Sequence, residues 1–123
     1  MFNATINFVS KELTAKQRIQ FKDTQDAVKI DKYLESNPEL ILDVDYYGTL
    51  QVQNDRSESG SYEQYIIVTK DGEKYTTGSD AFLSAFESIV SEMKDSDEEY
   101  AIRVYRMPSK NREGKYYLTC SII

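Results

Sequence analysis

The sequence predicts a mainly β fold of the α+β class, and three observations lead to that prediction. A long strand candidate spans residues 40–53, and two pairs of shorter strand candidates follow it. An amphipathic helix candidate separates the two pairs. This order of elements is that of the OB-fold, a five-stranded Greek-key barrel with a helix between its third and fourth strands. The 123 residues fit one domain, with the barrel at 40–123 and an extension at 1–39.

The N-terminal extension begins with a short strand candidate at residues 3–9, where apolar and polar residues alternate. We interpret Arg18–Phe21 as its return strand, which gives an N-terminal β-hairpin. Helical spacing of apolar residues then predicts a short helix over 26–34, and an ordered loop remains the alternative. The helix would end before Asn37-Pro38, because the residue before a proline avoids the helical region.

The predicted first barrel strand, residues 40–53, is interrupted by Gly48. Two interpretations remain open. A glycine inside a strand often marks a bulge or bend, and a bent first strand allows such a barrel to close. Alternatively, Tyr47-Gly48 forms a β-turn between two shorter strands. A polar loop at 54–61 follows.

The middle of the chain is predicted as a hairpin and a helix. Residues 62–70 and 73–77 form the hairpin, because Asp71-Gly72 is a strong turn signal. Ser79 is well placed to cap a helix over 80–94. The apolar stripe that would close the bottom of the barrel consists of Phe82, Ala85, Phe86, Ile89, Val90 and Met93.

A second hairpin, with strands at 100–107 and 115–123, ends the sequence. The alternation gives it one apolar face and one face that carries Arg, Tyr and Lys. Residues 100–123 contain five basic residues and one acidic residue, a net charge of +4, whereas the whole chain carries −6 and the first 99 residues therefore carry −10. The positive charge is thus concentrated in the hairpin.

Cations beside exposed tyrosines suit a partner with phosphates and flat bases, and single-stranded nucleic acid is the partner we expect. The predicted stacking platform is Arg103, Tyr105 and Tyr117. The side chains predicted to neutralise phosphates are Arg106, Lys110, Arg112 and Lys115. Candidates of second rank are Tyr47, Tyr65, Lys74 and Tyr75. Two structural interpretations compete, since tyrosines also pack within sheets and basic residues also protect edge strands from aggregation.

Composition argues against catalysis. The chain has no histidine, the usual general base and metal ligand, and its single cysteine is Cys120. It also has no glycine-rich phosphate loop. We therefore expect neither an enzyme nor a cofactor or metal. The sequence shows no signal peptide and no apolar run of about 20 residues, so we expect a reducing cytoplasm.

From Leu40 onwards, the chain resembles the single-stranded DNA-binding proteins of small, protein-primed Bacillus phages, in a hydrophobic first strand that follows an acidic turn and in four further segments. They are Ile67–Ser79, the helix at Ala81–Val90, Ala101–Tyr105 and Ser109–Leu118. The resemblance covers about two-thirds of the chain and leaves out the first 39 residues. It implies an OB-fold that coats displaced single strands during phage DNA replication in the host cytoplasm, with tyrosines stacked on bases.

The acidic net charge affects the affinity for DNA that we expect. The long-range field repels DNA, so we expect modest, sequence-tolerant affinity and cooperative binding that involves contacts between copies of the chain. The alternative is a small acidic phage protein that inhibits a host defence or DNA-binding protein by mimicking DNA. Its surface would consist of Asp43, Asp45, Asp95, Asp97, Glu98 and Glu99.

Overall fold

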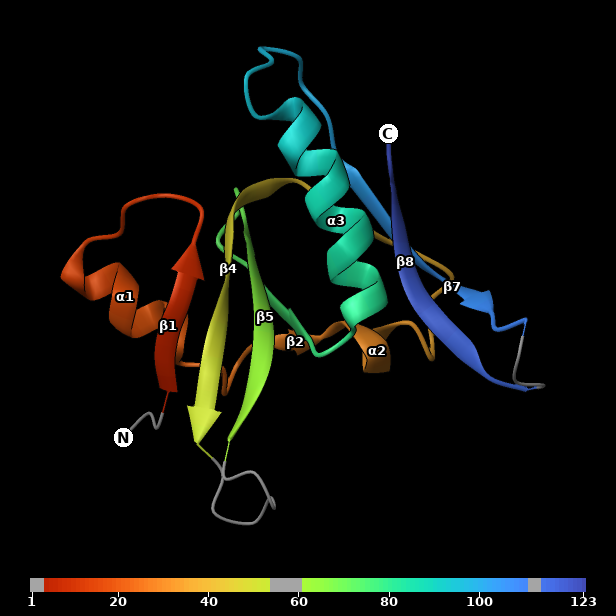
Figure 1. The fold of residues 1–123 in the computed structure, drawn as a ribbon, viewed down its shortest axis with the longest axis horizontal. Helices are drawn as coiled ribbons and strands as arrows, with labels where there is room; N and C mark the ends of the chain where they lie inside the picture. The colour runs from red at the N-terminus through yellow and green to blue at the C-terminus, as the bar shows by residue number, and fades with distance from the viewer. Residues whose placement is uncertain (1–3, 54–60, 111–113) are drawn as a thin grey trace. The chain divides into compact units, whose positions relative to one another are not determined.

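The computed structural model describes residues 4–53, 61–110 and 114–123. Most of the predicted loop at 54–61 and the predicted phosphate contact Arg112 lie outside these ranges. The mainly β class is confirmed, with two sheets and a few helices (Figure 1). The structure contains two compact units, Met1–Lys29 with Val44–Gly78, and Ile30–Asp43 with Ser79–Ile123. We call them unit 1 and unit 2.

Unit 1 contains a five-stranded sheet in the order β1-β4-β5-β6-β2. Its strands are β1 (Ala4–Val9), β2 (Val28–Lys29), β4 (Val44–Gln53), β5 (Ser61–Thr69) and β6 (Lys74–Thr77). All neighbouring strands are antiparallel except β2 and β6, which are parallel. The helix α1 (Ala15–Lys22) follows β1.

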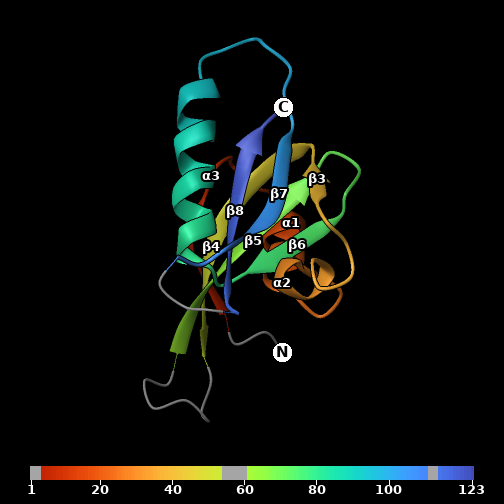
Figure 2. The same cartoon turned by 90° about the vertical axis from the view of Figure 1, so that its right-hand side faces the viewer.

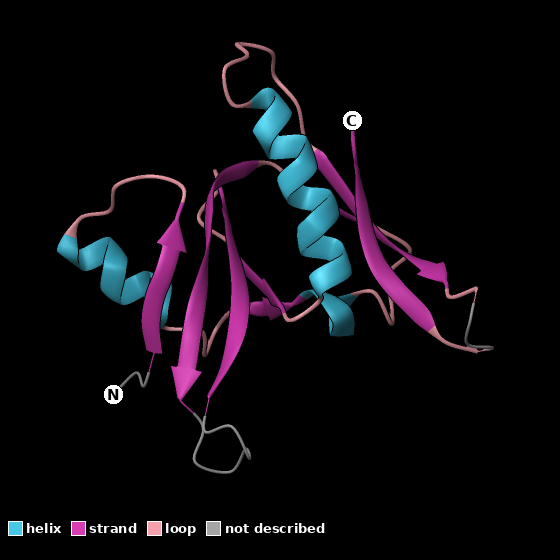
Figure 3. Ribbon diagram, viewed as in Figure 1, coloured by secondary structure: helices cyan, strands magenta, loops and turns pink. Residues whose placement is uncertain are grey.

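Unit 2 contains a three-stranded antiparallel sheet in the order β3-β7-β8. Its elements are α2 (Ile30–Tyr33), β3 (Leu40–Leu42), α3 (Asp80–Met93), β7 (Ile102–Pro108) and β8 (Tyr116–Ile122). The helix α3 contacts β8, and both views of the ribbon show them side by side (Figures 2 and 3). No helix among the described residues is both long and apolar enough to span a bilayer.

The predicted N-terminal β-hairpin is wrong, because Arg18–Phe21 lies in the helix α1 and β1 pairs with β4 instead. The physical reason is the capping box at the start of α1. The Thr14 hydroxyl accepts a hydrogen bond from the Gln17 amide, and the Gln17 side chain accepts one from the Thr14 amide. This reciprocal pair satisfies two amides at the helix start and favours helix over strand.

The predicted helix over 26–34 is largely replaced. Val28 and Lys29 form β2, which pairs with Tyr75 and Thr76 of β6, and only Ile30–Tyr33 is helical. The apolar side chains that suggested helical spacing are thus divided between a sheet edge and a single helical turn.

The segment 40–53 is two strands, but the interruption is at Asp43 rather than at Gly48. The strand β4 continues through Gly48 and pairs with β5 along its length, so a β-turn at Tyr47-Gly48 is excluded. The glycine is required for a different reason. A Cβ at Gly48 would lie 2.1 Å from the carbonyl oxygen of Phe8 and 2.9 Å from Cζ of Phe21. The missing side chain therefore allows β1 and α1 to approach β4.

The remaining predicted elements are confirmed within one or two residues. The β5–β6 hairpin turns at Asp71-Gly72, where Gly72 has a φ of 88°. The hydroxyl of Ser79 accepts a hydrogen bond from the Phe82 amide at 3.1 Å and so caps α3. The predicted apolar stripe of α3 buries Phe82, Phe86 and Val90.

Candidate nucleic-acid interface

The register of unit 2's sheet divides its side chains between two faces. The inner face buries Ile102, Val104, Leu118 and Cys120. We call the opposite side the outer face. Residues paired across an antiparallel ladder lie on the same side of the sheet. The outer face therefore consists of Ile41, Arg103, Tyr105, Met107, Tyr117, Thr119 and Ser121.

Arg103 and Tyr105 form a stacked pair on the outer face. The guanidinium carbon of Arg103 lies 4.5 Å from the centroid of the Tyr105 ring. The Tyr105 hydroxyl is 2.8 Å from Oγ of Ser121, the residue paired with Arg103 on the next strand. The Nε of Arg103 donates to the Glu39 carboxylate at 3.2 Å. These contacts hold the ring and the guanidinium in place while the Arg103 side chain stays 41% exposed.

Tyr117 lies on the same outer face, nearer to the turn that joins β7 and β8. It pairs with Met107 across the β7–β8 ladder, and the two residues are 43% and 41% exposed. Lys110 and Lys115, which flank the turn between the strands, are also exposed. The structure therefore brings the three predicted platform residues to one face and leaves them accessible.

Arg106 lies on the opposite side of the ribbon. It is paired with Leu118, and its guanidinium carbon lies 5.0 Å from the centroid of the Tyr116 ring. Tyr116 was not among the predicted site residues, because the alternation assigned it to the apolar face. It is nevertheless 58% exposed. The missed signal is its position at the start of β8, two residues before the first buried side chain of that strand.

The candidates of second rank belong to unit 1 and have structural partners there. Tyr47, Tyr65 and Tyr75 share one face of the five-stranded sheet, but Tyr65 is only 5% exposed. The ring of Tyr47 lies 5.8 Å from that of Phe8. The residues of unit 1 most similar to the predicted platform are therefore engaged in packing.

Lys74 extends from the other face of this sheet to the C-terminal end of α1. Its ammonium group donates to the carbonyl oxygens of Gln20 and Asp23 and lies 4.0 Å from the Asp26 carboxylate. A cation at this end of a helix satisfies carbonyl groups that lack an intrahelical partner. Lys74 thereby connects α1 to β6, and its side chain is mostly buried.

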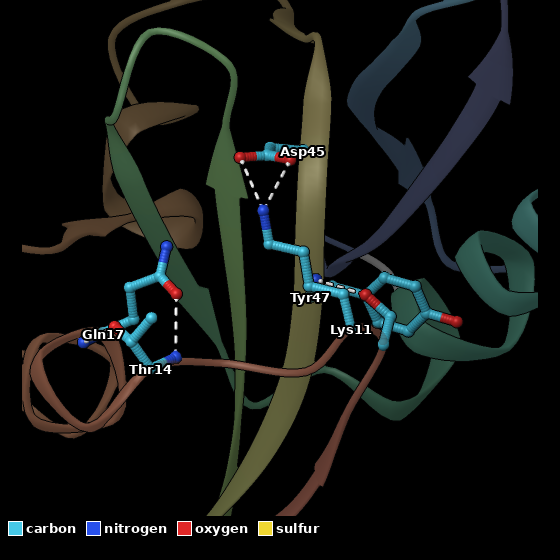
Figure 4. A network of polar contacts seen from close by, with 6 residues as sticks. Lys11, Thr14, Gln17, Asp45 and Tyr47 are labelled. Carbon is cyan, nitrogen blue, oxygen red and sulfur yellow. Dashed lines mark hydrogen bonds and ion pairs between the residues drawn. The ribbon is translucent and has the colours of Figure 1, made fainter.

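A polar network joins the loop after β1 to β4 (Figure 4). The ammonium of Lys11 contacts both carboxylate oxygens of Asp45, at 3.2 and 3.3 Å, and lies 4.6 Å from the Tyr46 ring centroid. Burial raises the pKa of the Tyr46 hydroxyl. Asp45 thus has a counterion within unit 1.

The carboxylates of the DNA-mimic alternative are divided between the two units. Asp45 belongs to unit 1, whereas Asp43 and the acidic residues at 95–99 belong to unit 2. The mimicry hypothesis stays a prediction.

Unit 1 also contains a cleft of about 520 Å³ between α1 and the turn that joins β5 to β6. Its lining mixes carboxylates, including Glu73, with the cations Lys70 and Lys74. In the adjoining turn, the hydrogen bond from the Thr69 hydroxyl holds the pKa of Asp71 below its usual range. The mixed charges give the cleft no preference for an anionic ligand.

Burial raises the pKa of the Cys120 thiol to about 11, so that the group is protonated at neutral pH. A protonated, buried thiol is a poor nucleophile. Within the described ranges, no three side chains of the metal-ligating types gather closely enough to hold an ion.

Comparison with known proteins gives no match. No protein-family model, no curated protein and no solved structure is significantly similar to the chain.

Proposed function

We propose that this chain is a single-stranded DNA-binding protein that coats DNA strands through the outer face of unit 2. The observation that carries the proposal is the exposed row in which Arg103 stacks on Tyr105 and Tyr117 lies beside Met107. Bases stack on aromatic rings with little regard to sequence, and arginine adds a cation beside the ring. Lys110 and Lys115 provide further positive charge for phosphates.

The pairing of the strands supports an OB-type arrangement for residues 40–123. The segment 40–53 contributes β3 to one sheet and β4 to the other, with only Asp43 between them. The strand β3 pairs with β7, β4 pairs with β5, and α3 lies between β6 and β7 in the sequence. A first strand shared between two sheets is what the Greek-key barrel requires.

The proposed binding is of modest affinity and independent of sequence. The chain carries a net charge of −6, so its long-range field opposes the approach of DNA. A coat protein resembling those of the protein-primed Bacillus phages would offset this through high abundance and contacts between neighbouring copies. This proposal does not require the acidic surface of the DNA-mimic alternative.

The direct test is titration of the protein with poly-dT at low salt, with tyrosine fluorescence and the anisotropy of labelled DNA as readouts. We expect quenching and an affinity that falls as salt rises. About three phosphate contacts, from Arg103, Lys110 and Lys115, predict a slope of about −2 for log K against log salt, because each contact to a single strand contributes about −0.7. Absence of quenching at high protein concentration would contradict the proposal.

Glu39 provides a more specific test. Its carboxylate forms an ion pair with Arg103, the side chain that a phosphate of the DNA should contact. We expect Glu39→Gln to tighten dT binding by up to about fivefold, the equivalent of an exposed ion pair. Glu35→Gln is the matched control, since it removes the same charge from an exposed position in unit 2. Equal tightening in both variants would show that net charge alone matters.

A further inference from the structure

The end of the β7–β8 ribbon is exposed on both of its faces. Burial along β7 stops after Tyr105, and burial along β8 starts only at Leu118. We call the residues between these limits the ribbon end: Arg106, Met107, Pro108, Tyr116 and Tyr117. In two perpendicular views, the N-terminal end of β8 extends beyond the end of α3 (Figures 1 and 2). This extension leaves the side of the sheet that is covered elsewhere open at the ribbon end.

The two faces of the ribbon carry the same combination of groups. On the outer face, the Arg103 guanidinium stacks on Tyr105, and Tyr117 follows. On the other face, the Arg106 guanidinium lies over the Tyr116 ring. Among the described residues, no carboxylate pairs with Arg106, whereas Arg103 contacts Glu39. Counting only the described residues, the second pair is the less neutralised of the two.

We propose that the ribbon binds two stretches of single-stranded DNA at once, one against each face. This inference rests on the proposed function and extends it to Tyr116 and Arg106, which form a second stacking site. Tyr116 is the more exposed of the two tyrosines, at 58% against 43% for Tyr117. The stretches are two segments of one folded-back strand or two separate strands, and the chemistry of recognition is the same for both.

Electrostatics permits this arrangement. Side chains on opposite faces of a sheet place their ligands on the order of 10 Å or more apart. That separation is about one Debye length at physiological salt, so the two phosphate backbones repel each other weakly. Lys110 and Lys115, near the turn, supply positive charge close to both faces.

The test is the number of short dT oligomers that bind to one chain. Each oligomer has about six nucleotides, which is within the range that a single OB-fold covers. Native mass spectrometry of the full chain in about 0.15 M ammonium acetate, where the two backbones are screened from each other, gives the number of oligomers per chain. We expect two for the unmodified protein, one for Tyr116→Ala and two for Tyr116→Phe, because phenylalanine keeps the stacking ring. Tyr117→Ala, on the outer face, should also give one. Circular dichroism shows whether each variant is folded.

The outcomes separate this inference from the proposed function. A stoichiometry of one that Tyr116→Ala leaves unchanged, while Tyr117→Ala weakens binding, overturns the second site but keeps the first. Failure of every protein to bind dT overturns the proposed function itself. Longer oligomers of about twenty nucleotides distinguish the two ligand arrangements: one per chain indicates a folded-back strand, and two per chain indicate separate strands.

Discussion

Replacing Phe21 by Ala is expected to lower the free energy of unfolding by about 3–5 kcal/mol, the usual cost of removing a buried phenylalanine ring. Phe21 is fully buried and belongs to the core of unit 1, together with Tyr46, Leu50 and Ile66. Its ring lies 5.9 Å from that of Tyr46 and directly over the space that Gly48 leaves empty. Loss of the ring would therefore leave a cavity between α1 and the sheet.

The measurement is urea unfolding of the variant and the unmodified protein. Phe8→Ala is the matched control, because it removes the same ring from a nearby residue that is 49% exposed. We expect the control to cost about 1 kcal/mol, since much of its ring is already in contact with water. Equal losses in the two variants would contradict the assignment of Phe21 to the core.

In the Tyr116→Ala background, where only the outer face binds, replacing Arg103 and Tyr105 together by Ala is expected to weaken dT binding by about 100-fold. Stacking contributes about 1–3 kcal/mol per base, and the guanidinium adds a phosphate contact. A loss of about 2.8 kcal/mol corresponds to the 100-fold change, because each 1.4 kcal/mol is a factor of ten. The anisotropy of labelled dT measures the change directly.

The control for this experiment is Lys16→Ala combined with Tyr62→Ala in unit 1. It removes the same types of group, a cation and a tyrosine that is 45% exposed, from the other sheet and from α1. We expect the control to keep nearly all of its affinity. A loss as large as that of the first variant would indicate binding by general charge and exposed rings, not by the outer face.

The elements that the sequence predicts well are those with local signals. The helix α3 has a serine cap and a continuous apolar stripe, and the β5–β6 hairpin has an Asp-Gly turn. The helix α1 was missed because a four-residue window at Arg18–Phe21 cannot separate the helical from the strand period. The Thr14 and Gln17 capping box was the visible signal. The pairing of β1 with β4 spans some 40 residues, and no local pattern determines it.

For the candidate site, too, local sequence patterns predicted only part of the arrangement. A period of two was enough to place Arg103, Tyr105 and Tyr117 on one face, because strand geometry alone determines it. Alternation could not show that Tyr65 is buried or that Lys74 contacts the end of α1, since both depend on other elements of unit 1. The exposure of Tyr116 depends on the length of α3 relative to β8.

The single cysteine of the chain provides a reporter that needs no engineering. Cys120 lies on the inner face of unit 2, and the chain contains no second thiol. Because Cys120 is only 7% exposed, its alkylation is expected to be faster when β8 separates transiently from its neighbours. The labelling rate of the native protein therefore reports on the opening of unit 2.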